Sequence, residues 1–143
     1  MLKRILITFT ALSLLSASPV HAKQDTHTHR KYHGVLPDYF YDSLAHCETG
    51  GNWQHSTRSY TGGLGIYRRT WQNWSNSSSA KGKPPEYQVY VADKIAFLGH
   101  MERGVFQYPI GVFGWGCVRR SKFLQSIICQ SKNPKVYRHR RNC

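Results

Sequence analysis

The sequence predicts a small α+β domain that is mostly helical, with a minor hairpin and disulfide bonds. Three observations support this fold class. Apolar residues recur at helical spacing in several segments, a short glycine-rich stretch alternates as strands do, and the cysteines form an even set of four. A length of 143 residues with 40% hydrophobic residues suits one compact domain and excludes two domains of ordinary size.

The N-terminal segment has the features of a secretory signal peptide. Two cations precede an apolar run over residues 5–15, and small residues stand at the −3 and −1 positions of a cut after Ala22. An uncleaved membrane anchor is the alternative, but this run is shorter than the roughly 20 residues that span a bilayer. We therefore expect removal of residues 1–22, no transmembrane anchor, and a protein that is secreted or associated with the cell wall.

Export decides how the cysteines are interpreted, because disulfides persist in oxidising compartments. No two cysteines are two to four residues apart, as the usual zinc sites require. We therefore expect two disulfides and no metal, while the sequence alone leaves three connectivities open. The cysteines are Cys47, Cys117, Cys129 and Cys143.

The chain is strongly basic. It has 20 Lys and Arg against 7 Asp and Glu, a net charge of +13 that becomes +11 once Lys3 and Arg4 leave with the signal peptide. Such a balance favours a polyanionic partner, such as nucleic acid, anionic lipid or an acidic wall polymer. It says nothing about the fold.

Residues 23–34 form a polar stretch without apolar periodicity, which predicts a flexible leader. His27, His29 and His33 lie within it and offer ligands to a transition metal. A solvated tail is the simpler interpretation.

The domain is expected to begin near Val35, with a helix that starts at Pro37 and ends at Glu48. Phe40, Leu44 and Cys47 share one face of this helix. Glycines at positions 50 and 51 supply the stop, because glycine adopts the left-handed conformation without strain.

Four further elements follow from the pattern. A turn or hairpin is expected between residues 53 and 70, and a helix over 69–76 that carries Trp71 and Trp74. The clearest helical periodicity runs over residues 85–101 and predicts a core helix that ends at Gly104. This helix is expected to bury Tyr87, Val91, Ile95 and Leu98. A last amphipathic helix would bury Phe123, Leu124, Ile127 and Ile128, ahead of a basic C-terminal patch.

Glu48 is the outstanding candidate among the seven acidic residues. It stands at the C-terminal end of its helix, where the macrodipole disfavours a charged carboxylate, and Trp53 and Trp71 are expected to add desolvation. A carboxylic acid that is held neutral can protonate a glycosidic oxygen. By position alone, a surface role for this glutamate is the alternative.

The segment 41–53, Tyr-Asp-Ser-Leu-Ala-His-Cys-Glu-Thr-Gly-Gly-Asn-Trp, resembles the start of the resuscitation-promoting-factor, or transglycosylase-like, domain. The likeness continues through Tyr-Thr-Gly-Gly-Leu-Gly-Ile at 60–66, Thr-Trp at 70–71, the helix that begins at Pro85, and Trp-Gly-Cys at 115–117. It covers roughly residues 36–118.

The resemblance implies a small lysozyme-like fold that acts on peptidoglycan, without a cofactor, over a catalytic domain of residues 35–118. Glu48 corresponds to the catalytic acid of that family, and Cys47 would be bridged to Cys117, with Cys129 and Cys143 as the second pair. By the same likeness, the glycan groove would be lined by Tyr60, Thr70, Trp71 and Gln88. For two of these the alternatives stay open, since Trp71 suits a core and Thr70 a helix cap.

Two features depart from the family pattern. Gly65 stands where the family has Gln, so a polar group facing the glycan is expected to be missing. The basic extension, residues 119–143, is not explained by the resemblance. Its cations would adsorb to anionic wall polymers, and a solvated surface is the simpler alternative.

The expected reaction is cleavage of the β-1,4 bond between N-acetylmuramic acid and N-acetylglucosamine by a secreted lytic transglycosylase or muramidase. A two-carboxylate hydrolase would need Glu86 or Asp93 to reach Glu48 through folding. A non-catalytic cationic wall-binding module is the main alternative. A nucleic-acid-binding protein is a weaker one, because tyrosines and tryptophans among cations do not make a motif.

Overall fold

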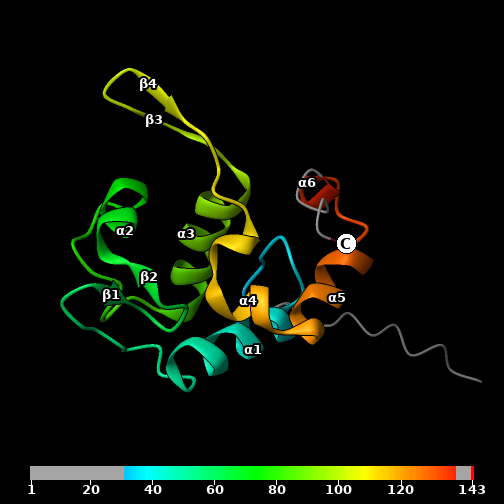
Figure 1. The fold of residues 1–143 in the computed structure, drawn as a ribbon. Coiled ribbons are helices and arrows are strands. Elements are labelled where there is room, and N and C mark those ends of the chain that lie inside the picture. Colours follow the sequence, from blue (N-terminus) through cyan, green and yellow to red (C-terminus); the bar gives the residue numbers. More distant parts are fainter. Residues whose placement is uncertain (1–30, 138–142) are drawn as a thin grey trace, which may run out of the picture.

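The computed structural model describes residues 31–137 and 143, and within them it confirms the mostly helical α+β class with minor hairpins and two disulfides (Figure 1). α3 lies at the centre, with α1 below it, α2 and the first hairpin on one side, and α4 and α5 on the other (Figure 1). The first elements are α1 (Asp38–Thr49), β1 (Tyr60–Thr61), β2 (Ile66–Tyr67), α2 (Arg68–Trp74) and α3 (Pro85–Phe97). They are followed by β3 (His100–Glu102), β4 (Val105–Gln107), the 3-10 helix η1 (Val112–Gly114), α4 (Gly116–Arg120), α5 (Lys122–Gln130) and α6 (Pro134–Tyr137).

Helix α1 follows its prediction closely. Pro37 is extended and caps the helix rather than entering its first turn, and Gly50 takes the left-handed conformation directly after Thr49. The Gly50 N–H bonds to the carbonyl of His46, and the Gly51 N–H bonds to that of Ala45. These glycines therefore end the helix just after Glu48, as the sequence indicates.

The expected continuation of α3 through Met101 to Gly104 is wrong, because the helix ends at Phe97 and Leu98 is extended. The returning chain supplies donors to the last turn: the N–H of Ile110 bonds to the carbonyl of Ile95 at 2.7 Å, and the N–H of Gly111 to that of Ala96 at 3.0 Å. With these carbonyls satisfied, the chain leaves α3 and forms a second hairpin.

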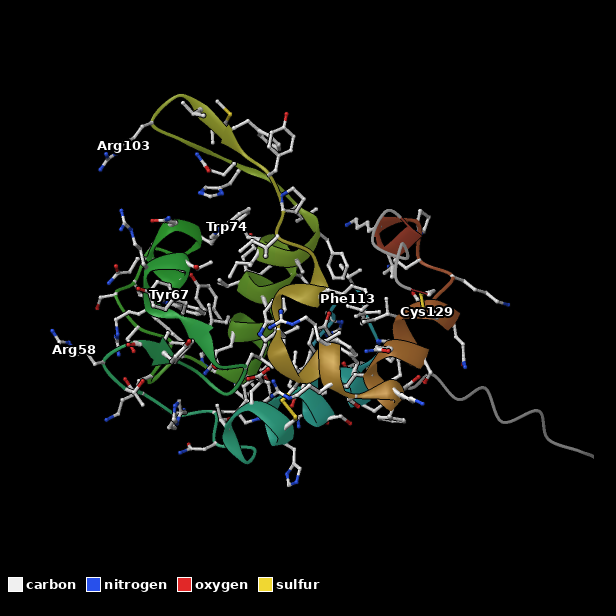
Figure 2. All side chains as sticks on the ribbon, in the orientation of Figure 1. Arg58, Tyr67, Trp74, Arg103, Phe113 and Cys129 are labelled. Carbon is white, nitrogen blue, oxygen red and sulfur yellow. A yellow bond between two sulfur atoms is a disulfide. The ribbon has the colours of Figure 1, made fainter. Side chains whose placement is uncertain are left out.

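That second hairpin, β3 and β4, projects away from the body of the domain (Figure 1). Its strands pair antiparallel, with Met101 opposite Phe106. Arg103 has a positive φ and, in Figure 2, points outward at the tip. Leu98, expected in the core, is instead partly exposed at the base of this hairpin.

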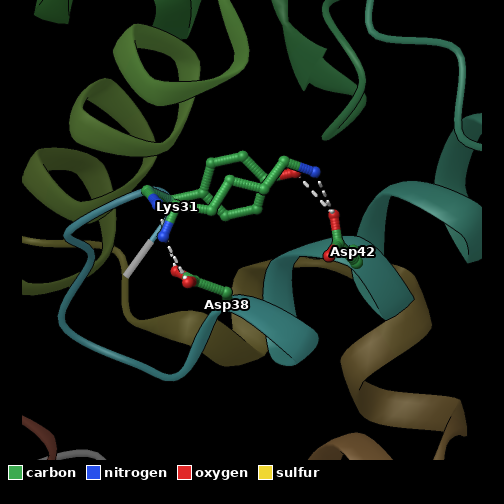
Figure 3. Close-up of polar contacts among 4 residues, drawn as sticks. Lys31, Asp38 and Asp42 are labelled. Carbon is green, nitrogen blue, oxygen red and sulfur yellow. Dashed lines mark hydrogen bonds and ion pairs between the residues drawn. The ribbon is translucent and has the colours of Figure 1, made fainter. Parts of the chain in front are cut away.

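The packed chain begins earlier than Val35. Tyr32 is only 3% exposed, and its hydroxyl donates to Asp42 at 2.5 Å. The backbone N–H groups of Lys31 and Tyr32 both donate to Asp38, in the first turn of α1, and the Lys31 ammonium pairs with Asp42 (Figure 3). Of the expected leader, residues 31–34 thus pack on the domain, while residues 23–30, with His27 and His29, lie outside the described residues.

The C-terminal segment shares the hydrophobic core of the domain. Leu124, Ile127, Ile128 and Val136 are buried in the same cluster as α1 and α3, whereas Phe123, expected to be buried, is exposed. The Asn133 side chain donates to the carbonyl of Val35, at the opposite end of the domain sequence. Residues 119–137 are therefore part of the domain's packing.

Asp93 is a buried carboxylate of α3 that anchors the N-terminal segment. It accepts hydrogen bonds from the Val35 N–H at 2.7 Å and from the Tyr41 hydroxyl at 2.5 Å. Burial raises the pKa of Asp93 to about 6, although both hydrogen bonds oppose that change. Burial and the neighbouring carboxylate also raise the pKa of Tyr41, which therefore stays a hydrogen-bond donor.

This carboxylate should make stability depend on pH. The folded-state pKa lies above the unfolded value of 3.8, so the folded protein binds the proton more tightly. The free energy of unfolding is therefore highest below pH 4 with respect to this group, and falls by up to about 3 kcal/mol as pH rises through 6. Urea unfolding between pH 4 and 7.5 measures this fall.

The Asp93→Asn variant should lose that part of the pH dependence, and Asp42→Asn, at an exposed position, should keep it. An identical pH profile for the wild type and Asp93→Asn would contradict the assignment.

Candidate functional site

An open cleft of about 550 Å³ lies between three parts of the chain. The C-terminal end of α1 forms its floor, the first hairpin and α2 form one wall, and the segment from residue 110 to α4 forms the other. Its lining residues are Glu48, Thr49, His55, Thr57, Tyr60, Gly65, Ile66, Tyr67, Thr70, Ile95, Ile110, Gly114, Trp115, Gly116, Arg119 and Arg120.

Glu48 lies in this cleft, half-buried, at the end of α1. Its Oε1 accepts a hydrogen bond of 2.9 Å from the backbone N–H of Cys117, in the first turn of α4. Within the described residues, no hydrogen bond reaches Oε2. One carboxylate oxygen is thus fixed by the protein, and the other is available to a ligand.

The disulfides fix the position of this carboxylate. Cys47 is bridged to Cys117, so consecutive residues of α1 are joined to the same residue of α4, one by sulfur and one by a hydrogen bond. The second bridge joins Cys129 to Cys143. The first pairing is the one that the family resemblance implies, and the second joins the two cysteines that this pairing leaves.

The wall opposite α4 is a turn of the first hairpin, residues 62–65. The Thr49 hydroxyl donates to the carbonyl of Gly63 at 2.7 Å, and the Trp115 indole N–H donates to that of Leu64 at 2.8 Å. Gly65 has a φ of +58°, and a Cβ placed on it would be 3.3 Å from the Cβ of Glu48. The turn therefore rests directly against the glutamate.

Tyr60 and Thr70, two of the expected groove residues, line the cleft. Tyr60 pairs with Tyr67 across the hairpin, and the two half-exposed rings make an edge contact with centroids 5.9 Å apart. Thr70 lies inside α2, which is capped at Tyr67, so the helix-cap alternative for Thr70 is wrong. Exposed aromatic rings beside a carboxylate suit the apolar faces of sugar rings.

Trp71 and Gln88 do not reach the cleft, and both are fully buried. Trp71 belongs to the core, and its indole N–H donates to Ser77. Gln88 lies beneath the turn. Its Oε1 accepts from the Gly63 N–H at 2.9 Å, and its Nε2 donates to the carbonyls of Trp53, Ala80 and Lys83. These two side chains support the wall and do not line it.

Sequence reasoning missed several lining residues. Tyr67 was detectable as the cross-strand partner of Tyr60, but Trp115, Arg119 and Arg120 reach the cleft only because the chain returns after the second hairpin. Trp53 and Trp71, which were expected beside Glu48, do not line the cleft, whereas Trp115 does.

Glu48 is the only carboxylate among the described residues that line the cleft. Asp93 is engaged with Val35 and Tyr41, and Glu86 is exposed in the first turn of α3. The described residues include no cluster of three potential metal ligands. The chemistry that this arrangement supports is proton transfer by one carboxyl group, next to surfaces that suit a sugar.

Comparison with known proteins identifies the relatives of this domain. Residues 37–103 match the family model of the transglycosylase-like domain. The chain is 33% identical over 85 residues to the resuscitation-promoting factor RpfD of Mycobacterium tuberculosis, covering 59% of this chain and 47% of the relative. The resemblance inferred from the sequence motifs is therefore confirmed over this segment.

Two other relatives match a similar segment. Identity is 31% over 88 residues to Rpf2 of Corynebacterium glutamicum, covering 59% of this chain and 22% of that protein. It is 34% over 71 residues to RpfE of M. tuberculosis, covering 49% and 39%. The matched region thus spans less than half the length of these relatives. No solved structure matches the chain significantly.

Substitution of Gln88 tests its supporting role. Gln88→Leu keeps the volume but leaves the Gly63 N–H and three carbonyls without their buried partner, so the free energy of unfolding should fall by about 2–4 kcal/mol. Urea unfolding measures this loss, and Gln72→Leu, at an exposed position of α2, is the control. A loss below 1 kcal/mol for Gln88→Leu would contradict a structural role.

Gly65 and Gly50 form a matched pair for testing contact with Glu48. Both have positive φ, but a Cβ at Gly50 meets nothing within 4 Å, whereas one at Gly65 meets Glu48. Each alanine variant should lose about 1 kcal/mol from backbone strain. Gly65→Ala should lose more, because the crowded neighbour is the stem of the glutamate. Equal losses in thermal unfolding would show that the turn does not press on Glu48.

Proposed function

Because residues 37–103 match the transglycosylase-like domain, we propose that this chain is a secreted peptidoglycan-cleaving glycosidase with Glu48 as its catalytic acid. The observation that carries the proposal is the position of Glu48: a single carboxylate, held at one oxygen by the Cys117 N–H, in a cleft with exposed tyrosine rings. The relatives that match this segment are resuscitation-promoting factors.

The proposed reaction cuts the β-1,4 bond between N-acetylmuramic acid and N-acetylglucosamine. Glu48 donates a proton to the glycosidic oxygen as the bond to the anomeric carbon breaks. The same carboxylate then accepts the proton of the muramic 6-hydroxyl as that oxygen attacks the anomeric carbon. The product carries a 1,6-anhydro ring, and the reaction consumes no water.

A lone carboxylate favours this route over hydrolysis. Two-carboxylate glycosidases place their acids about 5–10 Å apart on both sides of the bond, so that the second acid acts as nucleophile or activates water. Among the described residues that line this cleft, Glu48 is the only one with a carboxylate. With the nucleophile supplied by the substrate, one residue serves in turn as acid and base. Hydrolysis by a muramidase mechanism is the alternative outcome for the same site.

The proposed location is outside the cytoplasm, at the cell wall. The predicted signal peptide, residues 1–22, lies outside the described residues, and no helix within them is long and apolar enough to cross a membrane. The net charge of +11 that remains after removal of Lys3 and Arg4 would favour adsorption to anionic wall polymers. A purely wall-binding module remains the second candidate, since cations alone are sufficient for adsorption.

Replacement of the carboxyl group tests the proposal. Glu48→Gln keeps an oxygen that accepts the Cys117 N–H, so the fold should be retained while solubilisation of labelled peptidoglycan falls by at least 100-fold. Glu86→Gln changes an exposed carboxylate of α3 outside the cleft and should leave the rate within twofold.

Mass spectra of the digested wall identify the reaction. Anhydro-muramic ends are the expected products, and reducing muramic ends throughout would assign hydrolysis instead. If Glu48→Gln solubilises peptidoglycan as fast as the wild type, Glu48 is not the acid. Wall binding by the wild type without any soluble product would establish the non-catalytic module.

A further inference from the structure

Two arginines line the cleft beside Glu48, and nothing in the proposed proton transfer uses them. Arg119 and Arg120 form the end of α4, the short helix whose first turn holds Cys117 and so orients the glutamate. Both side chains are exposed. They add two positive charges to a cleft whose described lining has one carboxylate.

Arg119 is held in place through one of its nitrogens. Its Nη1 donates to the carbonyl of Phe113 at 2.8 Å and to that of Gly114 at 3.1 Å. Among the described residues, Nε and Nη2 have no acceptor. Gly114 itself lines the cleft, so this anchor fixes the guanidinium to the cleft wall and leaves its other edge available.

The guanidinium of Arg120 lies over Gly116. A Cβ added to Gly116 would be 3.0 Å from Nη1 and 3.5 Å from Nη2, so the missing side chain makes room for the arginine. The Nη2 atom is also 3.8 Å from the sulfur of Cys117. Arg120 is therefore placed over the turn that binds Glu48.

Neither arginine has a carboxylate partner among the described residues, where the ion pair found is that of Lys31 with Asp42. A guanidinium presents its donors in a planar fork that matches a carboxylate, often through two parallel hydrogen bonds. Two such forks on one wall, both without an acid, form a site for an anionic group of a ligand.

We propose that Arg119 and Arg120 form a subsite for a carboxylate carried by the muramic acid side of the bound strand. This inference rests on the proposed function, because it assumes that a glycan occupies the cleft. A polymer of N-acetylglucosamine alone is neutral, whereas muramic acid bears a lactyl group. The lactyl carboxyl group is free in peptide-free strands, or is joined to a stem peptide with carboxylates of its own. The subsite thus distinguishes murein from neutral glycans.

Binding measurements in the Glu48→Gln background test the subsite without consuming the ligand. The three probes, matched in sugar length, are a peptide-free muramic strand, a strand with stem peptides, and an N-acetylglucosamine oligomer. Arg119→Gln and Arg120→Gln should each reduce the preference for an anionic strand over the neutral oligomer by about 10-fold, as calorimetric dissociation constants report. The anionic strand that loses affinity identifies the lactyl or the peptide carboxylate as the bound group.

Three further variants separate this role from general charge and from folding. Arg58→Gln removes an arginine that points away from the domain in Figure 2, and it should leave the preference unchanged. Gly116→Ala crowds the Arg120 guanidinium without removing a charge, so it should reduce the preference, and by less than Arg120→Gln does. Arg120→Lys should restore only part of it, because a lysine lacks the planar fork.

The outcomes separate the two proposals. An unchanged preference in Arg119→Gln and Arg120→Gln, or an equal loss for all three probes, overturns the subsite even if the wild type cleaves murein. If the wild type cleaves no glycan but the preference still depends on the two arginines, the catalytic proposal fails and the anion subsite stands. If none of the glycans binds, both proposals are overturned.

Discussion

The attachment of α1 to α4 is the constraint on which the cleft depends. Cys47 is bonded to Cys117, and the next residue, Glu48, accepts the N–H of that same cysteine. A cross-link over 70 residues stabilises a fold by about 4 kcal/mol in the chain-entropy model. The hydrogen bond from the Cys117 N–H adds about 1 kcal/mol. The pair of contacts also leaves little freedom for the carboxylate, since its helix and its hydrogen-bond donor are covalently joined.

The opposite wall of the cleft, the turn of residues 62–65, depends on a buried polar side chain. Gln88 has no exposed surface, yet its amide satisfies backbone groups from three parts of the chain. A Cβ at Gly62 would collide with this amide, so glycine and glutamine form a matched set. Buried polar groups of this kind are costly when a partner is missing and specify one arrangement when all are satisfied. The turn that contacts Glu48 is consequently held from below as well as from its sides.

The sequence pattern predicted those features that depend on interactions between residues close together in the chain. The end of α1 at Gly50 and the first hairpin follow from glycine positions and apolar spacing, and the Cys47–Cys117 pairing follows from the family motif. Prediction failed where the outcome depends on contacts between segments that are far apart in the sequence. α3 continues its apolar period to Leu98, but donors from residues 110 and 111 end the helix earlier. Gln88 was assigned to the groove because the motif aligns it there, and only the packed structure shows the backbone groups that it satisfies.

The disulfide beside Glu48 also affects when the site can assemble. In a reducing cytoplasm, Cys47 and Cys117 would be thiols, and the glutamate's helix would be joined to α4 by non-covalent contacts alone. Full assembly of the site would then await translocation and oxidation. A murein-cutting enzyme built in this way would be latent in the cell that makes it, and competent only on the side of the membrane where its substrate lies.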